Sequence, residues 1–134
     1  IAGNQPSVAL KKACAKNPNI DLYENSTSAE ISDMLSVARV NVLPTFQSTG
    51  IKLKLLAALF NGGHCLVNAP MVVGTSLEKL VTIADSAETM KAALSELLKK
   101  EFPIEKVCLR KEGLVKFQNQ FTVNLLIKAL QDYF

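Results

Sequence analysis

The chain has 134 residues, of which 49% are hydrophobic, so it can form one domain of ordinary size but has no room for a second full domain. Fifteen lysines and arginines against twelve acidic residues leave a formal charge of +3, and the basic residues are scattered along the chain. This distribution argues against an extended surface that follows a nucleic-acid backbone.

The cysteines and the apolar runs indicate the compartment. Cys14, Cys65 and Cys108 lie far apart and form no Cys-x-x-Cys pair, which predicts reduced and mostly buried thiols in a cytosolic protein. The longest apolar runs are far shorter than the roughly 20 residues that a membrane-spanning helix needs. We therefore expect a cytoplasmic chain without a transmembrane segment. Because it begins at Ile1, we also expect it to be a C-terminal fragment of a two-domain protein.

The apolar pattern of the first 38 residues predicts two strands and two helices. The strands are expected at residues 1–3 and 19–25, and the helices at residues 6–17 and 27–38. The second helix should begin with a capping box, because Thr27 is followed three residues later by Glu30. Its buried face is expected to carry Ile31, Met34, Leu35 and Ala38.

Three further short strands are expected at residues 40–44, 64–68 and 81–85. The first of them is almost continuously apolar, which is typical of a strand buried on both faces of a parallel sheet. A helix over residues 50–61 should separate the first two strands and end at a pair of glycines. The buried stripe of this helix is expected to consist of Ile51, Leu55, Ala58 and Leu59.

The last third of the sequence is helical. Asp85 with Glu88 is expected to cap a helix over "SAETMKAALSELLKK", and the chain beyond it should be helical with a break near Gly113 or Asn119. Alternating strands and helices with short connections predict an α/β fold. We expect a Rossmann-like, mostly parallel sheet flanked by helices, with additional C-terminal helices, and residues 1–134 as one domain.

The turn "TFQSTGIK" joins an expected strand to the expected start of a helix. In an open parallel sheet such a turn lies at the carboxyl ends of the strands, where backbone N–H groups and the positive helix end attract an anion. Gly50 allows close approach, Ser48 and Thr49 can donate hydroxyl bonds, and Lys52 can reach the same charge from the first turn. Lys54 should point to a different side. A simple N-cap at Thr49 and a solvated Lys52 fit the same pattern.

Several motifs occur in an order and spacing known from one enzyme family. A strand ending in proline is followed by a loop, by "GIKLK", by a helix reading "LAALFNG", by the strand "CLV" and by "IAD" before the next helix. This pattern resembles the carboxyl-terminal, donor-binding domain of GT-B glycosyltransferases, especially family 4 (group 1), which includes many bacterial mannosyl- and glucosyltransferases. The likeness extends over most of the chain, to about Leu98.

The resemblance implies a function in hexosyl transfer. In this family the carboxyl-terminal domain binds a GDP- or UDP-linked sugar, an N-terminal domain binds the acceptor, and no metal or other cofactor is obligatory. By the resemblance, Tyr23 and Glu24 would flank the nucleobase. The residues that would face the diphosphate and the donor sugar are Ser48, Thr49, Gly50, Ile51 and Lys52. The fragment alone should not catalyse transfer, because the acceptor half is missing.

One departure from the family supports a different interpretation. Many members carry two glutamates eight positions apart, and Thr49 and Ala57 occupy those positions here. The helix glutamate generally holds the ribose hydroxyls, so its loss at Ala57 leaves ribose recognition unexplained. The alternative is therefore a non-catalytic binding or interaction domain that keeps the glycosyltransferase fold. A signalling receiver is a poor fit, because the expected strand ends lack an acidic cluster.

The remaining polar residues are expected to be structural or solvated. His64 is the only histidine, so the sequence offers neither a catalytic triad nor a metal site. Glu78 is expected to lie exposed on a short helical turn. A run of basic residues alternates with glutamates and should form a solvated face, with peripheral contact at the inner membrane surface as the alternative. This run comprises Lys99, Lys100, Lys106, Arg110, Lys111 and Lys116.

Overall fold

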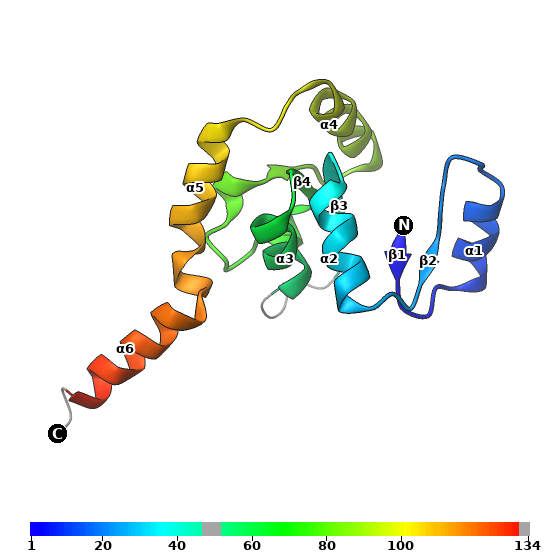
Figure 1. Cartoon of the computed structure of the whole chain (residues 1–134). Coiled ribbons are helices and arrows are strands. Elements are labelled where there is room, and N and C mark those ends of the chain that lie inside the picture. Colours follow the sequence, from blue (N-terminus) through cyan, green and yellow to red (C-terminus); the bar gives the residue numbers. More distant parts are fainter. Residues whose placement is uncertain (47–51, 132–134) are drawn as a thin grey trace.

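A computed structural model describes residues 1–46 and 52–131, in which strands and helices alternate (Figure 1). The strands are β1 (Ala2–Gly3), β2 (Tyr23–Glu24), β3 (Val40–Leu43), β4 (His64–Val67) and β5 (Thr82–Ile83). The α-helices are α1 (Val8–Ala15), α2 (Ser28–Val37), α3 (Leu53–Asn61), α4 (Ala87–Lys99), α5 (Ile104–Leu114) and α6 (Asn119–Gln131). Three short 3-10 turns complete the set, namely η1 (Ala69–Met71), η2 (Glu78–Leu80) and η3 (Val115–Phe117).

The strands form two separate parallel sheets. β1 pairs with β2, and β3, β4 and β5 form the second sheet in that order. The prediction of an α/β fold with parallel strands flanked by helices is confirmed. The single sheet that the sequence suggested is not present, because no ladder joins β1 to β3 in the described part of the chain. Instead, a cavity lies between these two strands.

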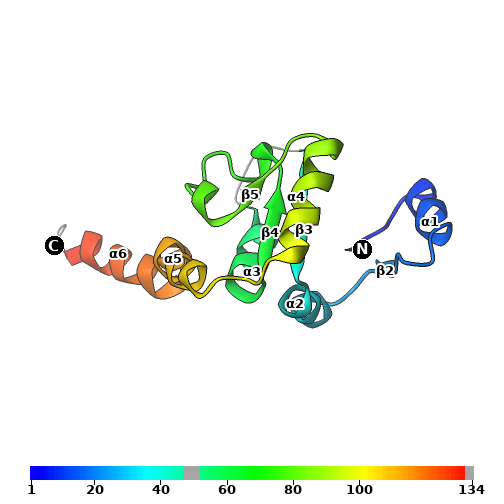
Figure 2. The ribbon, with the colours of Figure 1, turned by 90° about the horizontal axis from the view of Figure 1, so that it is seen from above.

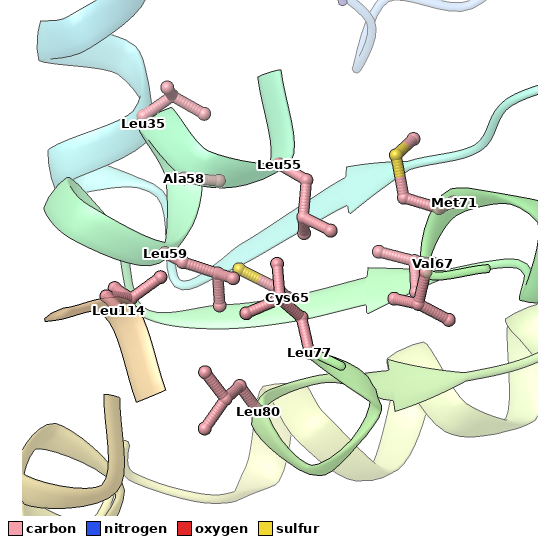
Figure 3. Packing of buried hydrophobic residues seen from close by; sticks show 11 residues of the cluster. Leu35, Leu55, Ala58, Leu59, Cys65, Val67, Met71, Leu77, Leu80 and Leu114 are labelled. Carbon is pink, nitrogen blue, oxygen red and sulfur yellow. The ribbon is translucent and has the colours of Figure 1, made fainter. Parts of the chain in front are cut away.

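The larger hydrophobic core lies on the α3 side of the second sheet (Figure 3). α3 buries Leu55, Ala58 and Leu59 along one stripe, as predicted, while Ile51 lies outside the described residues. Cys65 and Val67 alternate along β4 and point into the same layer. Side chains from the loop after β4 and from α5 close the cluster, namely Met71, Val72, Leu77, Leu80 and Leu114.

The opposite face of the second sheet is covered by α4 (Figure 2). Leu66 of β4 points to this side and packs with Ala84 and Leu97. The prediction that Asp85 and Glu88 cap α4 is wrong. Ser86 is the N-cap residue and exchanges hydrogen bonds with Thr89, whereas the Asp85 carboxylate accepts a hydrogen bond of 2.7 Å from the Ala69 N–H group. The carboxylate is therefore used to fix the neighbouring loop.

The start of α2 and the break between the C-terminal helices lie at or close to the positions that the sequence predicts. The capping box of Thr27 and Glu30 is present at the start of α2, as predicted. Of the four residues predicted to form the buried face of α2, only Leu35 is fully buried, and the others are partly exposed beside the cavity at β1. At the C-terminus the helical pattern breaks at residues 115–118, and α6 extends away from the sheets (Figure 1).

The sequence suggested that the whole basic run at residues 99–116 is solvated, but one member of it is buried. Arg110 is only 5% exposed and donates hydrogen bonds to the carbonyl oxygens of Gly62 and Gly63, at 2.7 and 2.6 Å. Its guanidinium group also lies 4.4 Å from the ring centre of Phe102. Arg110 therefore attaches α5 to the C-terminal end of α3, where the helix dipole favours a cation.

Candidate functional site

A groove borders the carboxyl ends of β1 and β2 and the start of α3. It encloses a cavity of about 440 Å³. The connection after β1 contributes Gly3 and Asn4, and the connection after β2 contributes Ser26. The other lining residues come from α2 and α3, namely Ser28, Ile31, Ser32, Leu35, Leu53, Lys54 and Ala57. In open α/β sheets this edge is where ligands bind, so the groove is the candidate site.

Side chains fasten the carboxyl ends of β3, β4 and β5 to one another. The Asn68 side-chain amide, just after β4, accepts a hydrogen bond from the Thr45 N–H group at 2.9 Å and donates one to the Thr45 carbonyl at 2.7 Å. The Asp85 carboxylate makes the equivalent connection from the end of β5 to Ala69. These bonds fix the edge of the sheet from which the segment between β3 and α3 departs.

Lys54 provides the positive charge of the groove. Its ammonium group donates a hydrogen bond of 2.8 Å to the Pro44 carbonyl oxygen, and its side chain lines the cavity beside Ala57. Loss of hydration lowers the pKa of Lys54, and the nearby charge of Lys52 lowers it further. A bound anion would relieve this repulsion between the two ammonium groups.

Of the residues that the resemblance assigned to the diphosphate and the donor sugar, only Lys52 lies within the described part of the chain. Ser48, Thr49, Gly50 and Ile51 lie outside the described residues. Lys52 is described and occupies the N-cap position of α3, rather than the predicted first turn, with its carbonyl oxygen accepting a hydrogen bond of 2.8 Å from the N–H group of Leu55. Lys54 lines the groove, whereas Lys52 is not among the lining residues. Lys54 and Ala57 are three residues apart, so they share the face of α3 that borders the groove.

Tyr23 and Glu24, the residues expected to flank the nucleobase, form β2 beside β1. The Tyr23 residue is 48% exposed, and the Glu24 carboxylate forms an ion pair of 2.5 Å with the Lys11 ammonium group. Neither residue is among those that line the groove.

The connections after β1 and β2 adopt an uncommon backbone conformation. Gln5 and Asn25 have φ angles of 48° and 54°, in the left-handed region that side chains other than glycine seldom occupy. The Gln5 N–H group donates a hydrogen bond of 3.1 Å to the Asn25 side-chain oxygen, which ties the two connections together. Sequence analysis missed these residues, although a polar residue directly after a strand was the available signal.

The other conspicuous polar side chains serve the fold. The His64 ring is buried, lies 3.2 Å from the Lys100 carbonyl oxygen through Nε2, and packs edge-on against Phe102. A cavity of about 300 Å³ beside Arg110 lies at the start of β4 and the end of α3, remote from the carboxyl ends of the strands. Glu78 is exposed on η2. None of these groups borders the groove.

The thiols are free, and the described part of the chain gathers no group of metal ligands. Cys14 and Cys65 are buried and Cys108 is exposed, and all three are free. Burial raises the pKa of Cys65, and the neighbouring Arg110 acts in the opposite direction. Within residues 1–46 and 52–131, no three His, Cys, Asp or Glu residues lie close enough together to hold a metal ion. Among the helices of these two ranges, none is both long and apolar enough to cross a membrane.

The fold and the groove define a class, namely an α/β protein with open parallel sheets and a cavity at the carboxyl ends of its strands. No protein-family model matches the chain, and no curated protein or solved structure matches it either.

Proposed function

We propose that this chain is the donor-binding domain of a GT-B glycosyltransferase and that the groove binds a nucleotide-diphosphate sugar. The observation that carries the proposal is the groove itself, because hydroxyls, an amide and an ammonium group from two connections and from α2 and α3 line one cavity. Convergent polar groups in a largely apolar cavity are the usual form of a small-molecule site. The sequence resemblance supports the same class of ligand.

The polar groups of the groove suit a diphosphate. Lys54 would exchange its bond to the Pro44 carbonyl for a charge-assisted bond to a phosphate oxygen. Ser26 and Ser28 can donate hydroxyl bonds from the start of α2. Negative charge accumulates on the departing diphosphate during transfer, so fixed donors at this position would lower the barrier. The acceptor would come from an N-terminal domain.

A second candidate function is a non-catalytic binding or interaction domain with the same fold. Ala57 lines the groove at the position where the family usually has the glutamate that holds the ribose. A methyl group there cannot accept a hydrogen bond from a ribose hydroxyl. Under this interpretation the groove binds no nucleotide diphosphate, and another molecule covers the carboxyl edge.

Calorimetric titration of the 134-residue chain with GDP, UDP and the corresponding monophosphates tests the proposal. We expect a diphosphate to bind and Lys54→Met to weaken its affinity by about 1–3 kcal/mol, the range for a charge-assisted bond. Lys91→Met, on the exposed surface of α4, is the matched control and should leave the affinity unchanged. If neither diphosphate binds, the interaction domain becomes the better interpretation.

Two further parts of the proposal have separate measurements. Incubated with a sugar nucleotide and an acceptor, the chain alone should transfer no sugar, because transfer needs the acceptor-binding domain. Peripheral contact with the membrane would involve the apolar side chains that α6 exposes, including Leu125 and Leu126. Co-sedimentation with vesicles containing anionic lipid measures that contact directly, and its salt dependence separates a charge effect from an apolar one.

A further inference from the structure

The unit formed by β1, α1 and β2 is attached to the rest of the molecule by few interactions. Every hydrogen bond that the structure describes for residues 1–24 ends on a residue between 1 and 25. The unit continues into α2 through residues 25–27, where Asn25 has a left-handed φ of 54°. The unit also lies to one side of the second sheet (Figures 1 and 2). Such an attachment permits movement about residues 25–27.

Between this unit and β3 lies a second cavity of about 390 Å³, hereafter the β1–β3 gap. Ile1 and Ala2 line it on one side, and all four residues of β3 line it on the other. The partly exposed α2 side chains Ile31, Met34 and Ala38 also border the gap. A helix face that was predicted to be buried therefore remains only partly covered.

The backbone of β3 turns an unpaired edge toward the gap. The His64 N–H group of β4 donates to the Arg39 carbonyl oxygen at 3.2 Å, and Val40 lies opposite His64 in the ladder. The alternation of a parallel ladder then directs the N–H groups of Val40 and Val42 away from β4 and toward the gap. An unpaired strand edge of this kind is a template for another strand.

On the face of the second sheet that α4 covers, the β3 residue Val42 remains partly uncovered. Val40 belongs to the core cluster under α4, so Val42, two residues further along, points to the same face, where the residue is 41% exposed. In a single sheet with β1 placed between β2 and β3, the β1-to-β2 and β2-to-β3 connections would run in opposite directions. Right-handed crossovers would then place α1 and α2 on opposite faces of that sheet. α1 therefore belongs on the α4 face, and it leaves Val8 68% exposed and Leu10 also exposed.

We propose that the unit β1–α1–β2 swings about residues 25–27 so that β1 pairs with the free edge of β3. The product is one parallel sheet with the strand order β2-β1-β3-β4-β5, in which α1 covers Val42 beside α4. The groove described above includes residues from both sides of the hinge, Asn4 and Lys54 among them. If the proposed function holds, a nucleotide diphosphate that contacts both sides favours this closed state.

Pulsed electron paramagnetic resonance on the full chain tests the closure. Spin labels on Lys12→Cys in α1 and Ser95→Cys in α4, in a Cys108→Ser background, report the distance between the two helices. In the closed state the helix axes lie about 10 Å apart, the spacing of helices packed side by side. We expect a short-distance population that GDP or UDP increases. Hydrogen exchange of the Val42 N–H group should slow by roughly tenfold in step with that population.

Two lysine substitutions provide matched variants. Val42→Lys would bury a charge beneath α1 only in the closed state, so it should remove the short-distance population without lowering the stability of the open state. Val37→Lys, at an 83% exposed position at the end of α2, should leave the population unchanged. A population that Val42→Lys does not reduce would mean that α1 does not cover this face.

The two proposals fail separately. A short-distance population without nucleotide supports closure whether or not calorimetry detects binding. Binding of GDP or UDP with a single long distance and fast exchange at Val42, as fast as at the exposed Val73, overturns closure and leaves the proposed function standing. No binding together with a short-distance population overturns the proposed function alone. The absence of both binding and a short-distance population overturns both.

Discussion

Replacing Arg110 by methionine should destabilise the fold measurably, because the guanidinium group attaches α5 to the end of α3. Its hydrogen bonds to the carbonyl oxygens of Gly62 and Gly63 are charge-assisted, and such bonds contribute about 1.5–3 kcal/mol each. The contact with the Phe102 ring adds about 1 kcal/mol. Part of this loss is offset, because the variant no longer bears the desolvation cost of a buried cation. The methionine side chain also keeps most of the apolar contacts. We expect a net loss of about 2–3 kcal/mol.

Equilibrium unfolding in urea measures this loss as a lower midpoint with an unchanged slope, and the melting temperature should fall by roughly 10 °C. Lys111→Met, one residue further along α5 and exposed, is the control and should stay within about 0.5 kcal/mol of the parent. Arg110 also lowers the pKa of Cys65 against the effect of burial, so Arg110→Met should slow the alkylation of Cys65 at a given pH. Equal stability of the two variants would refute the attachment.

Three more predictions concern the backbone and the first turn of α2. Gly62→Ala should cost about 1–3 kcal/mol in urea unfolding, because its Cβ would lie 2.8 Å from the Leu35 carbonyl oxygen and 2.9 Å from that of Ala58, whereas Gly3→Ala meets nothing within 4 Å and should be neutral. Thr27→Ala removes the N-cap hydroxyl and should cost about 1 kcal/mol, and an unchanged midpoint would contradict the cap. Hydrogen bonds from Thr27 lower the pKa of Glu30 in the folded protein. The stability that the ionised carboxylate contributes should therefore be fully present above the pKa that Glu30 has in the unfolded chain, and it should be lost as the pH falls through the folded pKa. If the free energy of unfolding of Glu30→Gln falls with acid pH as steeply as that of the parent, this account is contradicted.

Local sequence signals were reliable wherever neighbours in the chain decide the structure. The capping box at Thr27 and the buried stripe of α3 at Leu55, Ala58 and Leu59 depend on contacts within a few residues, and both are present. Parallel strands separated by helices also followed from the alternation of patterns, because the chain must cross over between such strands. Of the residues assigned to the diphosphate and the donor sugar, Ser48, Thr49, Gly50 and Ile51 lie outside the described residues, so their assignment stays a prediction.

The errors concern groups whose partners are distant in sequence. The Asp85 carboxylate looked like a helix cap, but it contacts Ala69, and the Arg110 charge looked solvated, but carbonyl groups 47 and 48 residues away accept its hydrogen bonds. Sequence periodicity also does not specify how α3 packs beside α2, and this packing decides that Lys54 borders the groove.

The sequence by itself determined the class of the elements, their order and the capping box of α2, since these depend on short-range periodicity and local hydrogen bonds. Only the tertiary structure decided which polar groups converge on the groove, which cation is buried and whether β1 joins β3. These outcomes depend on long-range packing, in which the burial of one side chain is set by the position of elements far along the chain.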